Sequence, residues 1–97
     1  MIKFSKVSQC DYNSIGFMVK GDGQSTVLVI RLDVAPFNLT FSKKAPVEFD
    51  VHLSLDKYTA TAAVDALTGN TLTVTFATAM ADGEEVTINI LPVYASL

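Results

Sequence analysis

The chain has 97 residues, which is enough for one domain, residues 1–97, with a core of modest size. Hydrophobic residues make up 49% and charged residues only 18%, and the mean hydropathy is +0.37, so we expect another chain to cover part of the apolar surface. The net charge of −3 and the pI near 4.8 exclude the clustered basic surface that a nucleic-acid partner requires.

The N-terminal region argues against export and against a membrane. Residues 1–13 lack the continuous apolar stretch of a secretory signal, and the longest apolar run, residues 27–30, is too short to cross a bilayer. Cys10 is the only cysteine, so the chain has no internal disulfide, and the acid Asp11 beside it should raise the pKa of its thiol. These features predict a virion or cytoplasmic protein with no membrane partner.

The first half of the chain predicts three strands. Residues 15–20 and 25–34 flank Gly21-Asp22-Gly23, which is typical of a hairpin turn. Residues 27–30 are apolar on both faces, so the second strand should be central in its sheet or covered by a partner. Pro36 marks the entry to a third strand at 37–41, where apolar and polar residues alternate.

The second half predicts four more strands. After Pro46, residues 47–55 alternate in the same way. Residues 58–67 alternate too, which favours a strand, although their alanines and the following Gly69 leave a helix open. Residues 71–80 and 84–93 flank Asp82-Gly83 as a second hairpin, and Pro92 indicates an edge position or a bulge.

Strands with one polar and one apolar face are typical of antiparallel sheets stacked in a sandwich. The sequence therefore predicts an all-β, antiparallel β-sandwich of about seven strands with an Ig-like arrangement.

Residues 69–90 resemble the end of a bacterial immunoglobulin-like domain. The resemblance covers about a quarter of the chain and consists of the Gly69-Asn70 turn, a Thr-rich alternating strand at 72–76, the Asp82-Gly83 turn and a last strand at 86–90. Such domains usually have a Tyr shortly after the glycine turn, where this chain has Glu85-Val86. The Cys–Trp–Cys core of antibody domains is absent. The resemblance implies spacing, adhesion or surface decoration, and no reaction.

One strand carries the best candidates for a metal site. Glu48, Asp50 and His52 project from the same face of the predicted strand at 47–55, and carboxylates and imidazole are metal ligands. A neighbouring strand would have to supply a further ligand, and a solvated polar face explains the same alternation. We therefore predict no metal, cofactor or catalytic residue there.

Three other groups of residues could form reactive or binding sites, but their sequence context does not favour one. A thiol–imidazole pair of Cys10 and His52 has no supporting motif around it. The acidic turn at 82–85 could hold calcium loosely, but an ordinary solvated hairpin is the simpler interpretation. The turn at 21–23 lacks the helix and the Lys-Ser/Thr pair of a phosphate loop.

The aromatic residues divide into two groups by their polarity. The phenylalanines mostly fall on the apolar phase of their strands and are predicted to be core residues: Phe4, Phe17, Phe37, Phe41, Phe49 and Phe76. The tyrosines are the candidates for a contact surface, because a phenol tolerates partial exposure: Tyr12, Tyr58 and Tyr94.

Charge is distributed unevenly along the chain. Residues 1–45 hold six basic and three acidic groups, a charge of +3, whereas residues 46–97 hold one basic and seven acidic groups, a charge of −6. If the two halves occupy different faces, head-to-tail association of copies is favoured; if they interleave in one sandwich, which we prefer, the asymmetry averages out.

These observations predict a non-enzymatic structural or interaction protein with protein partners, because acid–base chemistry needs more titratable groups than one histidine supplies. The specific hypothesis is a virion accessory subunit, a capsid cement or decoration protein, which self-associates and docks on a larger assembly. The alternative is a carbohydrate- or surface-binding Ig-like module of a larger exported protein, for which the absence of Trp is unfavourable.

Overall fold

The computed structural model describes residues 1–41 and 46–95, and within these the chain forms seven β-strands and no helix. The strands are β1 (Lys3–Cys10), β2 (Ile15–Lys20), β3 (Val27–Arg31), β4 (Glu48–Leu53), β5 (Ala60–Val64), β6 (Thr71–Phe76) and β7 (Glu85–Val93). The prediction of an all-β chain with about seven strands is confirmed.

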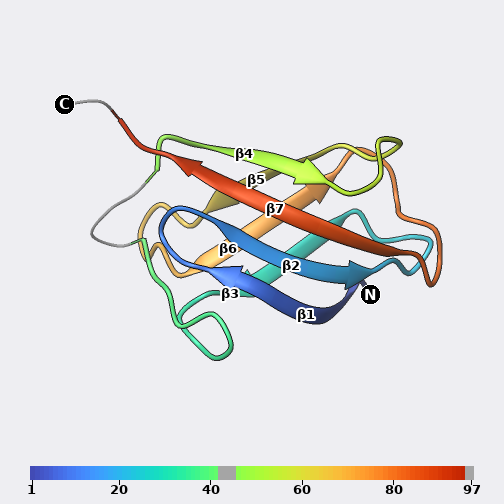
Figure 1. Ribbon diagram of the computed structural model, residues 1–97, viewed down its shortest axis with the longest axis horizontal. Coiled ribbons are helices and arrows are strands. Elements are labelled where there is room, and N and C mark those ends of the chain that lie inside the picture. Colours follow the sequence, from blue (N-terminus) through green and yellow to red (C-terminus); the bar gives the residue numbers. More distant parts are fainter. Residues whose placement is uncertain (42–45, 96–97) are drawn as a thin grey trace.

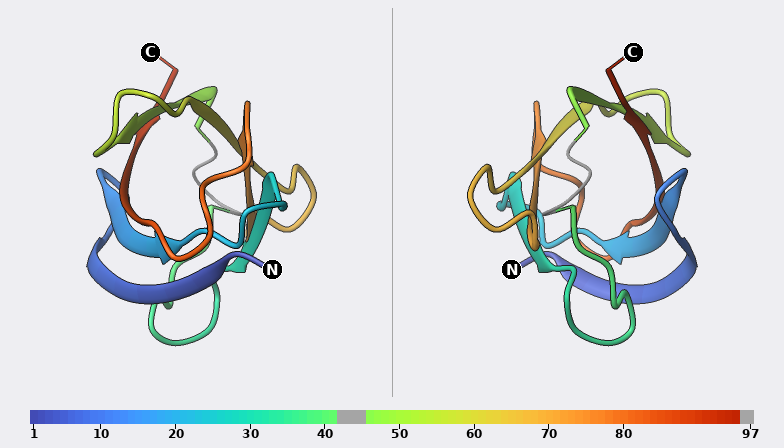
Figure 2. Two further views of the ribbon diagram at one scale, coloured as in Figure 1. Left: turned by 90° about the vertical axis from the view of Figure 1, so that its right-hand side faces the viewer. Right: turned by 90° about the vertical axis from the view of Figure 1, so that its left-hand side faces the viewer.

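The strands build two antiparallel sheets that stack face to face (Figure 1). The four-stranded sheet has the order β1-β2-β7-β4, and the three-stranded sheet has the order β3-β6-β5. The views along the long axis show the two layers, with β4 and β5 drawn together on one side (Figure 2). The predicted β-sandwich is therefore present.

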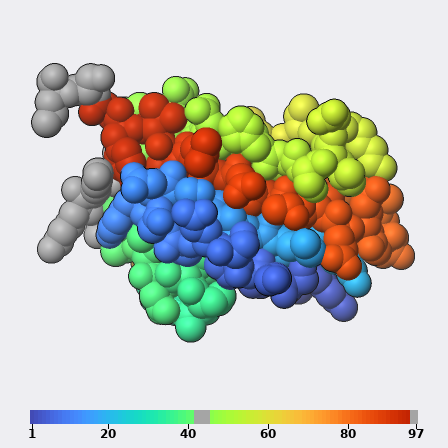
Figure 3. Space-filling view, viewed as in Figure 1, coloured from blue at the N-terminus to red at the C-terminus, as the bar shows by residue number. Residues whose placement is uncertain are grey.

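The sandwich is built from three long antiparallel arms that bend from one sheet into the other. The first arm is β2 with β3, the middle arm is β7 with β6, and the third is β4 with β5, because β2 and β4 both pair with β7 while β3 and β5 both pair with β6. In the space-filling view of the outer face of the four-stranded sheet, the strands lie side by side as separate bands (Figure 3).

Both predicted hairpins are wrong, because their turns are the bends of these arms. The 21–23 turn leads from β2 into β3, and the Asp82-Gly83 turn leads from β6 into β7, so each connects the two sheets. The two bends bind each other through backbone bonds: Gly21 N–H to Glu84 O at 2.9 Å and Gly83 N–H to Gly21 O at 2.9 Å. Pairing along the arms thus continues through residues whose local chemistry also suits a hairpin.

The segment at 58–67 contains a strand, as the alternation favoured. Residues Ala60–Val64 form β5, and the chain then turns at Asp65, whose carboxylate accepts the backbone N–H groups of Leu67 and Thr68 at 2.8 and 3.1 Å. Gly69 follows with φ of 64°, a conformation that glycine adopts without strain. The helix that remained open in the sequence does not form, because β5 pairs along its length with β6.

The predicted strand at 37–41 is wrong, although its alternating pattern does bury the right side chains. Phe37, Leu39 and Phe41 are buried, but the backbone is irregular, and Asn38 has φ of 51°. Single backbone bonds tie it down: Leu39 N–H to Leu32 O at 2.7 Å and Phe41 N–H to Gly69 O at 2.8 Å. Pro36 therefore precedes an irregular segment that adds to the core.

The first strand, β1, was missed by the sequence reasoning. Its pairing with β2 shifts register between Phe4 and Lys6 and again between Val7 and Gln9. Each bulge adds a residue and moves the alternation onto the other face of the strand. A period of two is therefore hidden in Lys3–Cys10, and the total of seven strands agrees only because the segment at 37–41 is not one.

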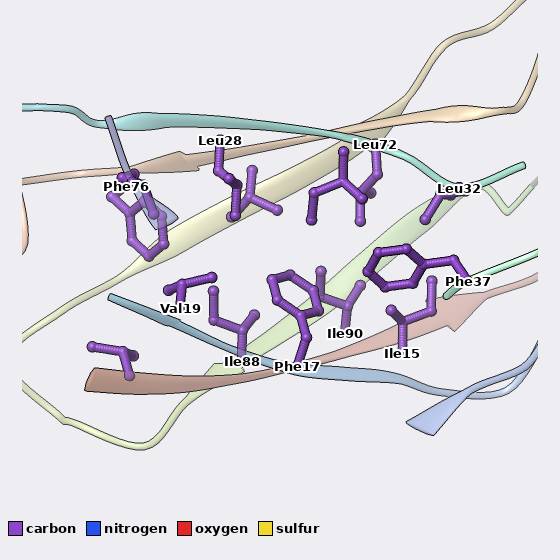
Figure 4. Close-up of a cluster of buried hydrophobic side chains, with 14 of the residues drawn as sticks. Ile15, Phe17, Val19, Leu28, Leu32, Phe37, Leu72, Phe76, Ile88 and Ile90 are labelled. Atoms are coloured by element: carbon purple, nitrogen blue, oxygen red, sulfur yellow. The ribbon is translucent and has the colours of Figure 1, made fainter. Parts of the chain in front are cut away.

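The core lies between the two sheets and is entirely apolar among the described residues. Side chains from β2 and β7 point toward those from β3 and β6 (Figure 4). Phe17, Ile88 and Ile90 face Leu28 and Leu72 in this layer, and all five are buried. Alternation along each strand places these residues inward, and their burial holds the sheets together.

The strand order was left open by the sequence. Constant-type immunoglobulin domains place the fifth strand in the first sheet and the seventh beside the sixth, and here those two positions are exchanged. β3 is an edge strand, so the prediction that it is central is wrong, while the alternative of a covering partner stays a prediction. Pro92 lies beyond Ile90, where pairing of β7 with β2 ends, which confirms the predicted edge position.

Candidate interaction surface

Glu48, Asp50 and His52 lie on one exposed face of β4, as the spacing predicted. The residues opposite them on β7 are Val93, Leu91 and Asn89, which supply no carboxylate or imidazole. Across residues 1–41 and 46–95, no three His, Cys, Asp or Glu side chains gather where they could hold a metal ion. The further ligand that a metal would need is not brought to these three residues.

The fold also separates Cys10 from His52. Cys10 ends β1 and His52 lies on β4, and these strands are the two opposite edges of the four-stranded sheet. Partial burial raises the pKa of the Cys10 thiol, and the negative charge of Asp11 raises it further, as the sequence indicated. The thiol is thus held in its protonated, less nucleophilic form.

The acidic turn at 82–85 is engaged in a structural network. Glu84 accepts a hydrogen bond from the Tyr58 hydroxyl at 2.5 Å and forms an ion pair with Lys57 Nζ at 2.9 Å. These two contacts lower the pKa of the Glu84 carboxyl. The Tyr58 oxygen also accepts the Ala81 N–H at 2.9 Å. Tyr58, expected at a contact surface, is instead buried, and it ties the bend between β6 and β7 to the segment that precedes β5.

The other two tyrosines do meet. The Tyr94 hydroxyl donates to the carbonyl oxygen of Tyr12 at 2.6 Å, and the Tyr12 ring lies edge-on to Phe41 with centroids 5.7 Å apart. Burial raises the pKa of Tyr94, with smaller contributions from Tyr12 and Asp11. This pair joins the turn after β1 to the C-terminal end of β7, and Tyr12 is the more exposed of the two.

Phe4 is the exception among the predicted core phenylalanines. Its ring contacts Phe17 and Phe37, with centroids 5.8 and 5.4 Å away, yet 38% of the residue is exposed. Phe49 is half-buried, and the remaining phenylalanines are buried as predicted. Phe4 is exposed because β1 is an edge strand with no described neighbour on its outer side.

A concave apolar surface lies between the free edges of the two sheets, at β1 and β3. It is a groove of about 630 Å³. Five of the nine large hydrophobic residues that are exposed in the described chain lie along it: Met1, Phe4, Val27, Val29 and Val34. We call these five residues the apolar patch. A contiguous apolar surface on a small domain is typical of an interaction site.

The groove carries little free charge. Its charged groups are the amino group of Met1, which pairs with Asp22, and the side chains of Lys3 and Arg31. Arg31 is neutralised by Asp33 through two hydrogen bonds, Nε to Oδ1 at 2.9 Å and Nη2 to Oδ2 at 2.7 Å. The Asp33 contact raises the pKa of the guanidinium, and Arg31 lowers that of the Asp33 carboxyl. Among the described residues that line the groove, Lys3 is therefore the one cation without an ion-pair partner, and none carries a carboxylate.

The backbone of β3 also offers free hydrogen-bonding groups. Two bonds bracket its ladder with β6, Phe76 N–H to Thr26 O at 2.7 Å and Leu32 N–H to Asn70 O at 2.8 Å. In an antiparallel ladder, hydrogen-bonded and non-hydrogen-bonded pairs alternate. The backbone N–H and C=O groups of the even-numbered residues of β3 therefore point toward β6. The N–H and C=O groups of Val27, Val29 and Arg31 point outward, away from the sheet.

Sequence reasoning found only part of this surface. The apolar run at 27–30 indicated a covering partner, and it contains Val27 and Val29. Met1, Phe4 and Val34 gave no such signal, because their exposure depends on which strands end the sheets.

The two halves of the chain interleave, since each sheet contains strands from both. Within the four-stranded sheet, however, Lys3 and Lys6 lie on the β1 edge, whereas Glu48 and Asp50 lie on the β4 edge. Lys43 and Lys44, which contribute to the charge of the first half, lie outside the described residues.

Comparisons of the chain with protein-family models, with curated proteins and with solved structures gave no match. In the part of the chain that the structure describes, no helix has the length and apolar character needed to span a membrane.

Proposed function

We propose that this protein is a non-enzymatic structural or interaction subunit that associates with other protein chains, its own copies included. The observation that supports this proposal is the apolar patch along the groove between β1 and β3. Val27 and Val29 are 51% and 60% exposed there although they lie in a regular strand. Moving a valine side chain from full exposure to full burial is worth about 1.5–3 kcal/mol, so covering the exposed half of each valine gains on the order of 1 kcal/mol. A partner that closes the groove gains this free energy from several residues at once.

The composition supports the same proposal. A charged fraction of 18% is low for a domain that buries no charged residue among those described and places its charges on the surface. Much of the remaining surface is therefore formed by Thr, Val, Ala and Ser. Covering such a surface removes fewer full charges from water than covering a typical domain surface does.

The setting that we propose is a virion surface, with the protein acting as a capsid cement or decoration subunit; a location in the cytoplasm before assembly is compatible with this role. The resemblance of residues 69–90 to bacterial Ig-like domains, which implies surface decoration, supports this setting by analogy.

The test begins with the proteins encoded beside this chain's gene. If they include capsid or tail subunits, shells assembled from them should bind the purified protein and carry it into the pellet on sedimentation, saturating at a fixed ratio. Shells of an unrelated capsid are the control. Shells that bind no protein contradict the proposal, and cell-wall or glycan genes as neighbours, with binding on a glycan array, would favour a carbohydrate-binding module instead.

A further inference from the structure

The three-stranded sheet is one strand short of the sheet that it stacks on. The first two arms of the fold place β2 and β3 at corresponding positions in the two sheets. β1 pairs with the outer edge of β2, but no described strand pairs with the outer edge of β3. The groove lies at this position, and β1 and β3 form its two sides.

The other sheet edges carry features that discourage pairing with a further strand. β1 has two bulges and the charges of Lys3 and Lys6, and β4 exposes Glu48 and Asp50. β5 lies against β4, on the side of the sandwich opposite the groove (Figure 2). β3 has no bulge in its pairing with β6, and its solvent-exposed side chains include two valines, Val27 and Val29. It is the one edge in the described chain that is regular, apolar and open.

We propose that β3 pairs antiparallel with β3 of a second copy of this chain, across a two-fold axis at Val29. Val29 then faces Val29 of the second copy, and Val27 faces Arg31 of the second copy. All of these residues direct their N–H and C=O groups outward, so each facing pair exchanges both of its hydrogen bonds. The two sheets join into one continuous sheet, β5-β6-β3 of each copy. This inference rests on the proposed function, because it assigns the surface through which the protein self-associates.

Charge and area both suit a second copy as the occupant. The register keeps the two Arg31 side chains apart, each opposite a valine and each already neutralised by Asp33 of its own chain. An exposed apolar patch of this kind covers on the order of 300–600 Å². Two such patches bury on the order of 1,000 Å² together, which is the lower limit for a specific interface, so we expect a dimer of modest affinity.

A cross-linking experiment tests the register. Val29→Cys is introduced together with Cys10→Ser, which removes the only native thiol, and the protein is oxidised with diamide. Facing Cα atoms in such a pair are about 5.5 Å apart, within the range that a disulfide spans. Val27→Cys in the same background is the matched control, because two copies of residue 27 are about 14 Å apart along the strands. We expect a disulfide-linked dimer from Val29→Cys and little from Val27→Cys.

Sedimentation equilibrium without cross-linking tests the surface. Val29→Lys places two charges at the centre of the strand pair, and we expect the dimer dissociation constant to rise about tenfold or more. Thr61→Lys is the control, because Thr61 is exposed on the outer face of the same sheet at its other edge, on β5. It should leave the constant within about twofold.

Three outcomes would overturn the inference: a wild-type chain that is monomeric at about 1 mM, a dimer that Val29→Lys leaves intact, or preferential cross-linking through position 27. Binding to capsid shells is measured separately, so a monomer that still decorates shells refutes the β3 pair alone. A β3-paired dimer that binds no shell refutes the virion setting alone.

Discussion

Gly21 lies where the first arm leaves the four-stranded sheet, and it has no room for a side chain. A Cβ atom there would lie 2.5 Å from the Ala81 carbonyl oxygen and 2.6 Å from Met80 Cβ. These atoms belong to the facing bend, which is itself held by the hydrogen bonds of Gly21 with Glu84 and Gly83. Close approach of two backbones, and not an unusual φ, requires glycine at this position.

We therefore expect Gly21→Ala to lower the free energy of unfolding by about 1–3 kcal/mol, measured by urea denaturation. Gly83→Asn is the comparison, because Gly83 has φ of 80° but no atom within 4 Å of its Cβ position, and asparagine tolerates that conformation. It should cost less than about 1 kcal/mol. An unchanged urea midpoint for Gly21→Ala would show that the two bends separate readily.

Tyr58 is the second residue on which the bends depend. Its hydroxyl donates to Glu84 and accepts the Ala81 N–H, so Tyr58→Phe leaves that N–H without its partner. We expect a loss of about 1–3 kcal/mol in the free energy of unfolding. Tyr12→Phe is the control: Tyr12 is partly exposed and its hydroxyl has no hydrogen bond in the described chain, so the change should stay within about 0.5 kcal/mol. Equal effects of the two substitutions would contradict the role given to Tyr58.

Among the segments, the irregular stretch at 37–41 shows how a strand pattern can serve another purpose. Its odd-numbered residues point into the core just as those of a strand would, and they close the side of the sandwich next to Leu32 and Gly69. No described strand pairs with this backbone in a ladder. Its stability therefore comes from side-chain burial more than from backbone pairing.

The same leucine-to-alanine substitution at a buried and at an exposed position tests whether burial of these residues stabilises the fold. Leu39 is 8% exposed and Leu67 is 93% exposed, and neither lies in a strand. Leu39→Ala should lower the free energy of unfolding by about 2–4 kcal/mol, because it leaves a cavity, whereas Leu67→Ala should change it by less than about 0.5 kcal/mol. If neither substitution changes the midpoint of thermal or urea unfolding, residues 37–41 do not contribute to the stability of the core.

For the molecule as a whole, acid should be the main chemical stress. Among the described residues, five carboxyl groups have pKa values below their ordinary range: Asp11, Asp22, Asp33, Asp65 and Glu84. The shift is largest for Asp22, which binds the amino group of Met1 and also accepts hydrogen bonds from Ser25 and Gln24. The unfolded chain lacks these contacts, so its carboxyls take up protons at a higher pH than those of the folded protein.

Stability should therefore be fully present above the ordinary carboxyl pKa of about 4 and should fall as the pH drops below it. Urea midpoints measured from pH 6 down to pH 2 test this expectation. Asp22→Asn should flatten the dependence, since it removes the group with the largest shift. Asp82→Asn is the control, because the exposed Asp82 side chain makes no hydrogen bond or ion pair in the described chain, and it should leave the dependence as in the wild type. A stability that rises on acidification would have the opposite sign and would contradict this account.

The sequence by itself determined that the protein is all-β and where most strands lie, because apolar and polar residues alternate along a strand that is buried on one face only. It also determined the shared face of Glu48, Asp50 and His52, which follows from that period alone. Only the tertiary structure decided which strands are neighbours: an Asp-Gly turn serves equally well in a hairpin and in a bend between sheets, so its local chemistry does not distinguish them. The same holds for the groove. Phe4 is exposed because β1 ends its sheet, and Val27 and Val29 are exposed because they alternate with the buried Leu28 and Ile30 onto the outer face of the three-stranded sheet. That β1 and β3 lie at the edges depends on pairings between residues far apart in the chain.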